Sequence, residues 1–213
     1  MSIRIKNGQT ILFIGDSITD CGRRAEERPL GNGYVKLFAD LVTIREPAKQ
    51  IRIINKGIGG ERVTDLANRW TDDVLRHKPD WLSVKIGIND LHSHLRQSPD
   101  SVSPALHRKR YDEILARTRA ALPKCRILLI EPFYISTDGS PNGWRRQGMD
   151  LMPPYLSSVR AMSRKYDAGL VRTHDLFQKL LKHHEAETFC LEPVHPHLTG
   201  HLAIAEAVYD TLS

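Results

Sequence analysis

Short apolar runs alternate along this chain with longer stretches whose apolar positions recur at helical spacing. The apolar runs predict strands over residues 10–15, 51–55, 81–86, 126–131 and 169–173. The longer stretches predict helices over residues 34–45, 64–77, 104–122, 150–166 and 198–212. No internal repeat interrupts this pattern.

This alternation of strands and helices predicts an α/β protein, a three-layer α/β/α sandwich in which helices cover both faces of a parallel sheet. The loops that follow parallel strands meet at one edge of such a sheet. We therefore expect Ser17 to lie near the segments 57–61, 87–90 and 131–134, and we look for a site there.

Composition narrows the class of protein. The chain has 213 residues, 40% of them apolar, which is enough for one core, so we expect a single domain over residues 1–213. The amino terminus is unlike a signal peptide and the three cysteines have no disulfide or metal-ligand spacing, so we expect a cytoplasmic protein without a membrane partner. Its net charge of +6 comes from interleaved acidic and basic residues, which disfavours a nucleic-acid partner.

Ser17 is the candidate nucleophile. It follows the first predicted strand after only Gly15 and Asp16, which places its hydroxyl at the carboxyl edge of the sheet. A hydroxyl is a weak nucleophile at neutral pH. The hypothesis therefore requires a base, a group that orients the base, and donors for the oxyanion.

The next two strand ends offer such donors. Gly60 lies in a glycine-rich loop where a backbone N–H can approach a ligand, and Asn89 brings a neutral side-chain amide. Taken singly, the glycines indicate tight turns, and Asn89 with Asp90 indicates an Asx turn or a helix start. Their occurrence at consecutive strand ends favours an oxyanion site.

The base and its orienting group are predicted near the carboxyl terminus. Glu192 precedes His195 by three residues, so its carboxylate can accept from one ring nitrogen while the other faces a hydroxyl. The spacing predicts a catalytic Ser17, His195 and Glu192, with Gly60 and Asn89 as oxyanion donors.

These segments resemble the SGNH or GDSL-type serine hydrolases over nearly the whole chain. The four sequence blocks typical of that family occur here in order, as Gly15-Asp16-Ser17, Gly60, Gly87-Ile88-Asn89-Asp90 and His195-Pro196. The resemblance implies that the N–H of Ser17 completes the oxyanion hole with Gly60 and Asn89. Within that family, Phe13 to Gly22, Lys78-Pro79-Asp80-Trp81 and Pro132-Phe133-Tyr134-Ile135 are most similar to the intracellular acetyl xylan esterases.

The resemblance implies the SGNH hydrolase fold, with a parallel, flavodoxin-like five-stranded sheet, and hydrolysis of acetyl esters of xylo-oligosaccharides without a cofactor. One position departs from the family, because Glu192 stands where the family has aspartate. The loop must absorb the extra methylene, since a displacement of about 1 Å can cost on the order of a hundredfold in rate. A glutamate can still hold the imidazole in the correct tautomer. If Glu192 is an imperfect orienting group, Glu192→Asp should restore the spacing typical of the family and raise kcat/KM.

Substrate contacts are expected from the long connection 132–154, where glycines and Pro141 argue against a long regular element. The candidate substrate-binding residues are Tyr134, Trp144 and Arg145 of this connection, together with Asp16. A subunit interface or a lid is an equally weighted interpretation of this connection.

Other functions stay open on the sequence alone. A short-chain lipase-like esterase or thioesterase would use the same residues, and an impaired carbohydrate-binding protein would bind sugar without turnover. His92-Ser93-His94 has a spacing that a metal site could use, although no second ligand set accompanies it. The acetylated oligosaccharide is the expected partner, and a homo-oligomer is left open.

Overall fold

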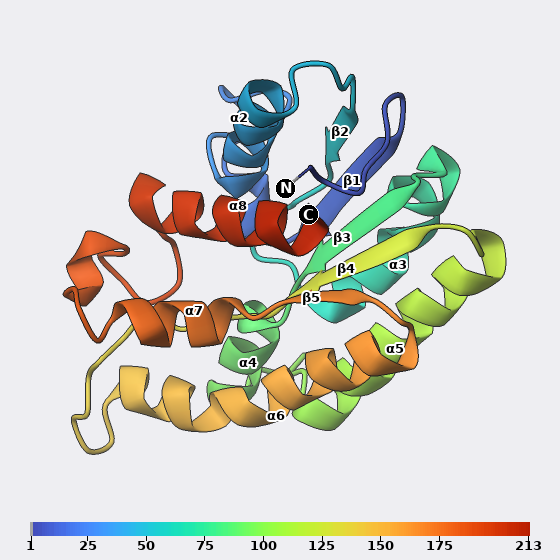
Figure 1. Cartoon of the computed structure of the whole chain (residues 1–213). Helices are drawn as coiled ribbons and strands as arrows, with labels where there is room; N and C mark the ends of the chain where they lie inside the picture. The colour runs from blue at the N-terminus through green and yellow to red at the C-terminus, as the bar shows by residue number, and fades with distance from the viewer. Residues whose placement is uncertain (1) are drawn as a thin grey trace.

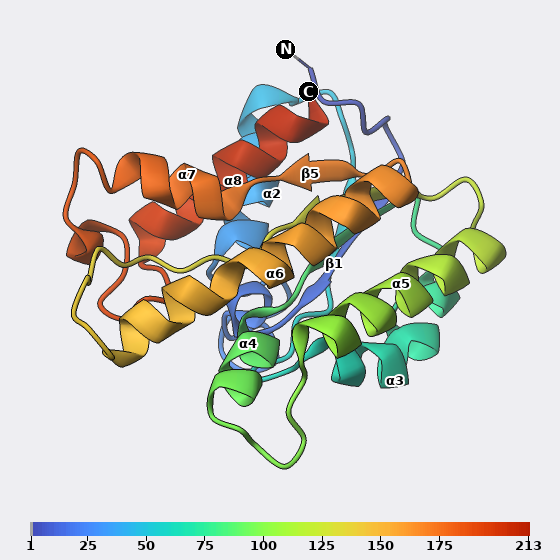
Figure 2. The same cartoon turned by 90° about the horizontal axis from the view of Figure 1, so that it is seen from below.

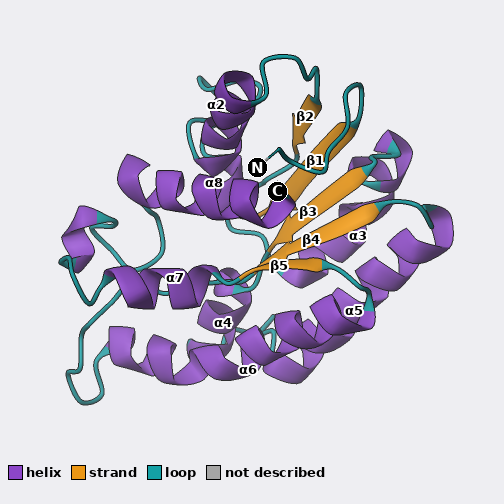
Figure 3. Ribbon diagram, in the orientation of Figure 1, coloured by secondary structure: helices purple, strands orange, loops and turns teal. Residues whose placement is uncertain are grey.

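The computed structural model describes residues 2–213. Its centre is one parallel sheet in the order β2-β1-β3-β4-β5 (Figure 3). This is the flavodoxin-like order and confirms the predicted fold class. The strands are β1 (Thr10–Gly15), β2 (Arg52–Asn55), β3 (Trp81–Lys85), β4 (Arg126–Ile130) and β5 (Gly169–Val171).

Two separate cores lie on the two faces of the sheet, because successive side chains of a strand point to opposite sides. On β1, Ile11 and Phe13 pack in one core, whereas Leu12 and Ile14 pack in the other. Helices cover both faces (Figures 1 and 2). The first core includes residues of α2 (Tyr34–Arg45) and α8 (Leu198–Leu212), and the second includes residues of α3 (Val63–Asp73), α5 (Pro104–Ala121) and α6 (Trp144–Lys165).

The main elements were well predicted, and the short helices were not. β1, α2 and α8 have the expected bounds, and the other strands end or begin one or two residues inside theirs. Short helices have too few turns to show a clear apolar period, so the sequence pattern did not predict them. These are α1 (Ser17–Asp20), α4 (Ile88–Leu95) and α7 (Thr173–Leu180), together with the single turn Ala186–Thr188. The helix predicted over residues 64–77 is divided into α3 and the single turn Leu75–His77.

The expectation that residues 132–154 hold no long regular element is wrong, since α6 begins at Trp144. Gly143 precedes the helix, and Gly148 lies within it where a Cβ would come within 2.8 Å of the Tyr134 ring. Pro153 and Pro154 are exposed, so the carbonyls that lose their donors can bind water. Packing of the buried face therefore outweighs the low helix propensity of these residues.

No helix within residues 2–213 is both long and apolar enough to cross a membrane. Cys21, Cys125 and Cys190 are free thiols.

Candidate active site

Ser17 is the first residue of α1 and follows the end of β1 after only Asp16, as its position after an apolar run predicted. Its Oγ lies 2.8 Å from His195 Nε2, although the two residues are 178 positions apart in the chain. This distance is within hydrogen-bond reach, so the imidazole can take the proton of the hydroxyl. The structure therefore brings together the predicted nucleophile and base.

Asp16 lies beneath the nucleophile and does not line the cleft described below. Its side chain is fully buried, and Oδ1 caps α1 by accepting from the N–H of Ile18 at 3.0 Å. Lys85 Nζ lies 3.4 Å from each carboxylate oxygen. The expectation that Asp16 contacts substrate has no support in this geometry, which fits a residue that positions Ser17.

Lys85 is a residue that the sequence interpretation missed. It ends β3 opposite Gly15 of β1, and its side chain is completely buried. Burial lowers the pKa of Lys85, and the adjacent Asp16 carboxylate opposes this shift. Its Nζ also lies 4.9 Å from the centre of the Phe133 ring. A lysine within the otherwise apolar end of a central strand was the signal that could have revealed the pair.

Glu192 holds the imidazole of His195 through a compact loop. Its Oε1 accepts from His195 Nδ1 at 2.5 Å and from the His195 backbone N–H at 2.6 Å. Its Oε2 accepts from the N–H of Val194 at 3.1 Å. The loop curls around the longer side chain, so the extra methylene has been absorbed. This geometry gives no support to the expected misplacement of the imidazole.

Each member of this pair favours the charged form of the other. The hydrogen bond that His195 donates to Glu192 raises the pKa of His195, in opposition to partial burial. Partial burial alone would raise the pKa of Glu192, but the hydrogen bonds from His195 and Val194 bring it below its usual value. Both side chains stay accessible to water, with exposed fractions of 60% for His195 and 48% for Glu192.

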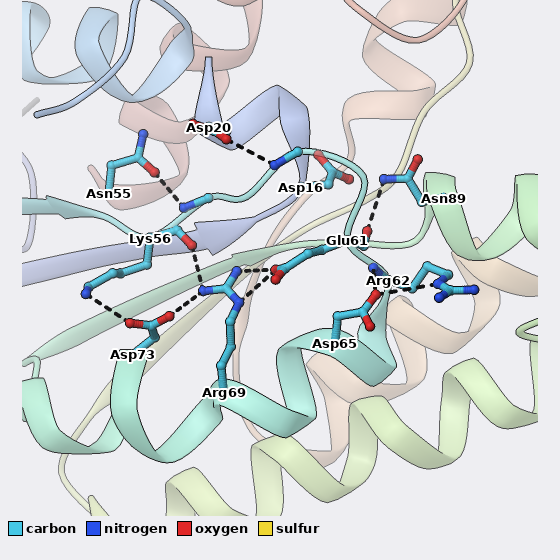
Figure 4. A network of polar contacts seen from close by, with 12 residues as sticks. Asp16, Asp20, Asn55, Lys56, Glu61, Arg62, Asp65, Arg69, Asp73 and Asn89 are labelled. Carbon is cyan, nitrogen blue, oxygen red and sulfur yellow. Dashed lines mark hydrogen bonds and ion pairs between the residues drawn. The ribbon is translucent and has the colours of Figure 1, made fainter. Parts of the chain in front are cut away.

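The loop that contains Gly60 also contacts Asn89, and both residues are expected to donate to an oxyanion. Gly60 has a φ of 81°, a left-handed conformation that favours glycine. Glu61 follows Gly60 in this loop, and its carbonyl accepts from Asn89 Nδ2 at 3.0 Å. An amide NH₂ has a second hydrogen, which this contact leaves free. Figure 4 shows how the loop brings Asn89 close to Glu61.

Ion pairs with residues of α3 hold this loop in place. The Glu61 carboxylate pairs with Arg69 of α3, which also donates to the carbonyl of Lys56 at 2.9 Å and to Asp73 at 2.8 Å (Figure 4). Lys56 Nζ lies 2.9 Å from Asp73, which closes the network. The guanidinium therefore ties both ends of the 56–61 segment to one helix.

Asn89 and Asp90 lie in the first turn of α4, so the helix-start interpretation was correct for both. This does not compete with a role in chemistry, because the turn also orients the Asn89 amide. Asp90 is buried and accepts from the N–H of Val63 at 3.0 Å. Burial raises the pKa of Asp90 to about 7.

A cleft of about 700 Å³ opens beside the Ser17–His195 pair. Three aromatic side chains follow one another along it, since the His92 ring lies 5.8 Å from that of Tyr134 and 5.7 Å from that of Trp144. The predicted Tyr134, Trp144 and Arg145 all line this cleft. The other lining residues are Gly60, Arg62, Asn89, His92, Ser93, Arg96, Ser98, Asp100, Glu192, Pro193, Val194 and His195.

Three other histidines have local contacts. His92 belongs to the cleft, and His94 Nδ1 lies 3.2 Å from the hydroxyl of Ser101. His174 lies in the first turn of α7, where its Nδ1 accepts from the N–H of Tyr134 at 3.4 Å. Within residues 2–213, no three histidine, cysteine or carboxylate side chains are grouped so that they could hold a metal ion.

A flavodoxin-like sheet that carries a serine, a histidine and a carboxylate at its carboxyl edge defines a serine hydrolase of the α/β class. Residues 13–203 match the model of the GDSL-like lipase/acylhydrolase family. The chain belongs to this family and is a carboxylic ester hydrolase.

Individual relatives support the same class. The chain is 36% identical to an acetylxylan esterase of Geobacillus stearothermophilus, over 96% of this chain and 94% of that protein. The crystal structure of that organism's acetylxylan esterase Axe2 superposes with a TM-score of 0.87 at 34% identity, covering 99% of this chain and 97% of Axe2. LAE5, an α/β hydrolase from the metagenome of Lake Arreo, gives a TM-score of 0.88 at 30% identity, covering 99% of this chain and 98% of LAE5.

Catalytic variants of Axe2 have also been solved. In these structures a serine, an aspartate or a histidine of Axe2 is replaced by alanine. The aspartate and the histidine of Axe2 are three residues apart, which is also the separation of Glu192 and His195.

Proposed function

We propose that this esterase removes acetyl groups from xylo-oligosaccharides, with Ser17 as the nucleophile, His195 as the base and Glu192 as the group that orients it. One observation carries the proposal: an unbroken chain of hydrogen-bond contacts runs from Ser17 Oγ through His195 to Glu192, at 2.8 Å and 2.5 Å, beside an aromatic cleft. The acetylxylan esterase relative supports the substrate, and its three catalytic positions support the residue roles.

The reaction follows from this arrangement in two halves. Ser17 Oγ attacks the acetyl carbonyl while its proton moves to His195 Nε2, and Glu192 stabilises the imidazolium that forms. The tetrahedral intermediate collapses when His195 returns the proton to the departing sugar oxygen, which leaves an acetyl group on Ser17. Water, deprotonated by His195, then attacks this acetyl-enzyme and releases acetate and the free serine.

The oxyanion of each tetrahedral intermediate is assigned to three donors. These are the backbone N–H groups of Ser17 and Gly60 and the free hydrogen of the Asn89 amide. The loop that carries Gly60 accepts the other Asn89 hydrogen, so one rigid segment sets the positions of two donors. Donors fixed before the reaction need not reorganise as charge develops.

The cleft is assigned to the sugar, with Tyr134, Trp144 and Arg145 as contacts. Trp144 has 40% of its surface exposed, so part of its indole can contact a sugar ring. We further propose that one hydrolase domain spans residues 1–213, and that the enzyme acts in the cytoplasm on fragments from xylan degradation.

Acetate release from acetylated xylo-oligosaccharides tests this function. The wild type should release acetate, and Ser17→Ala should release none while keeping its melting temperature. Ser157→Ala, an exposed serine of α6, is the matched control and should keep full activity. Release of acetate by Ser17→Ala would overturn the assignment of the nucleophile.

Two further measurements separate the alternatives. Synthetic esters of increasing acyl length should be hydrolysed fastest as acetates, whereas a lipase-like enzyme or a thioesterase would prefer longer acyl chains or thioesters. A chelator should leave the rate unchanged. Loss of activity that added zinc restores would indicate a metal-dependent hydrolase instead.

A further inference from the structure

Two guanidinium groups of the cleft lack an acidic partner. Arg96 and Arg145 both line it, and neither forms an ion pair with any carboxylate of residues 2–213. Many arginines elsewhere in the described chain are paired, including the neighbouring Arg146, which contacts Asp150 at 2.9 Å. Two cationic groups without an ion-pair partner therefore lie in the cleft where substrate would bind.

The other charged groups of the cleft already have partners. Arg62 pairs with Asp100 at 2.5 Å and with Asp65 at 3.5 Å. Glu192, the second carboxylate of the cleft wall, is held by His195. Burial and the nearby Arg96 lower the pKa of His92 to about 4, so this imidazole is neutral at pH 7. No lining carboxylate is left to neutralise Arg96 or Arg145.

The start of α6 adds to this positive potential. Trp144 and Arg145 are the first residues of the helix, Gly143 gives it no side-chain cap, and its first turn contains no acidic residue. The positive end of the helix dipole and its unpaired N–H groups therefore face the same region as the Arg145 guanidinium.

An aromatic surface that can contact a sugar lies next to Arg96. The Arg96 guanidinium carbon is 5.1 Å from the centre of the Trp144 ring, and His92 packs against the same ring. A pyranose that contacts the exposed part of Trp144 would direct a charged substituent toward Arg96 or Arg145.

We propose that the preferred substrates are acidic: acetylated xylo-oligosaccharides that carry a uronic acid, whose carboxylate binds Arg96 and Arg145. This inference rests on the proposed function and adds a charge preference to it. A planar carboxylate matches the fork of a guanidinium, which can donate two parallel N–H bonds. Without such a substituent, both cations would contribute little to binding a neutral sugar.

The test compares matched acetylated xylo-oligosaccharides with and without a glucuronic acid branch. We expect the wild type to prefer the acidic substrate by roughly tenfold in kcat/KM, a moderate figure because Arg96 is exposed. In Arg96→Gln and Arg145→Gln this preference should fall by severalfold, and in the double variant it should vanish. Arg146→Gln, one residue along α6 and outside the cleft, should retain it.

Competition with a neutral substrate identifies the anion. Glucuronate should inhibit the wild type at concentrations where xylose does not, and Arg145→Gln should weaken this inhibition. If inorganic phosphate inhibits more strongly than glucuronate, the uronic acid assignment is overturned, and the anionic group that the cleft recognises is that of a phosphorylated sugar. Equal kcat/KM for acidic and neutral substrates would overturn the inference and leave the esterase assignment intact. Hydrolysis of neither substrate would instead reject the proposed function.

Discussion

The two carboxylates that flank the Ser17–His195 pair are held in opposite ways. Asp16 is fully buried, caps the short helix that begins with Ser17, and faces the buried ammonium of Lys85. Glu192 belongs to a loop near the carboxyl terminus, is nearly half exposed, and is held chiefly by the two residues that it positions. One is anchored in the sheet, and the other is anchored in its own loop.

This difference indicates which half of the site tolerates substitutions and which does not. The sheet half, with Ser17, Gly60 and Asn89, depends on groups that cannot move without disturbing the core. The loop half, with Glu192 and His195, can adapt in sequence because water surrounds its polar groups. A longer acid side chain is tolerated in the loop for this reason, whereas the buried pair leaves little freedom at Asp16.

Breaking the buried pair should have the largest effect. In Asp16→Asn, the Lys85 ammonium is left buried without a counter-charge, which should lower the free energy of unfolding by about 3 kcal/mol or more. Urea denaturation measures this loss. The double variant Asp16→Asn with Lys85→Met removes both charges and should recover most of the stability. If the double variant is less stable than Asp16→Asn, the two charges are not coupled as described.

Removing an oxyanion donor should come next. Asn89→Ala should lower kcat by roughly a hundredfold with a smaller change in KM, because the amide acts on charge that develops in the transition state. Steady-state kinetics on an acetyl ester measure both constants, and Asn68→Ala, an exposed residue of α3, is the control. A rise in KM alone would assign Asn89 to substrate binding.

The loop half should respond more mildly and in a pH-dependent way. Glu192→Gln removes the charge that raises the pKa of His195, so the imidazole should lose its proton at a lower pH. Since the base must be neutral, the acidic limb of kcat/KM should move to lower pH, while the plateau falls by roughly tenfold to a hundredfold. An acidic limb that does not move would show that another group sets the pKa.

The smallest change should come from shortening the acid. Because Glu192 already reaches both ring and backbone nitrogens, Glu192→Asp should pull the carboxylate away from His195 and lower kcat/KM by severalfold. This is opposite to what the family pattern predicts. Pre-steady-state acylation rates measure the affected step directly. Faster acylation in the aspartate variant would show that the loop had not adapted to the longer side chain of Glu192.

The sequence by itself determined the sheet, most long helices and the residues proposed for chemistry. Apolar period and strand-end position are local properties, so Ser17, Asn89 and the Glu192–His195 spacing could be recognised without coordinates. The glycines and prolines in residues 132–154 led to the wrong prediction that this segment holds no long regular element. Local propensity does not include the packing that stabilises α6.

Only the tertiary structure decided the contacts between distant segments. Lys85 meets Asp16 across 69 positions of the chain because β3 pairs with β1, and no local pattern contains that pairing. Likewise, Arg96 at the end of α4 reaches Trp144 at the start of α6 only because the two helices pack together. Burial and charge balance depend on all neighbours in space, so they are fixed only when the chain has folded.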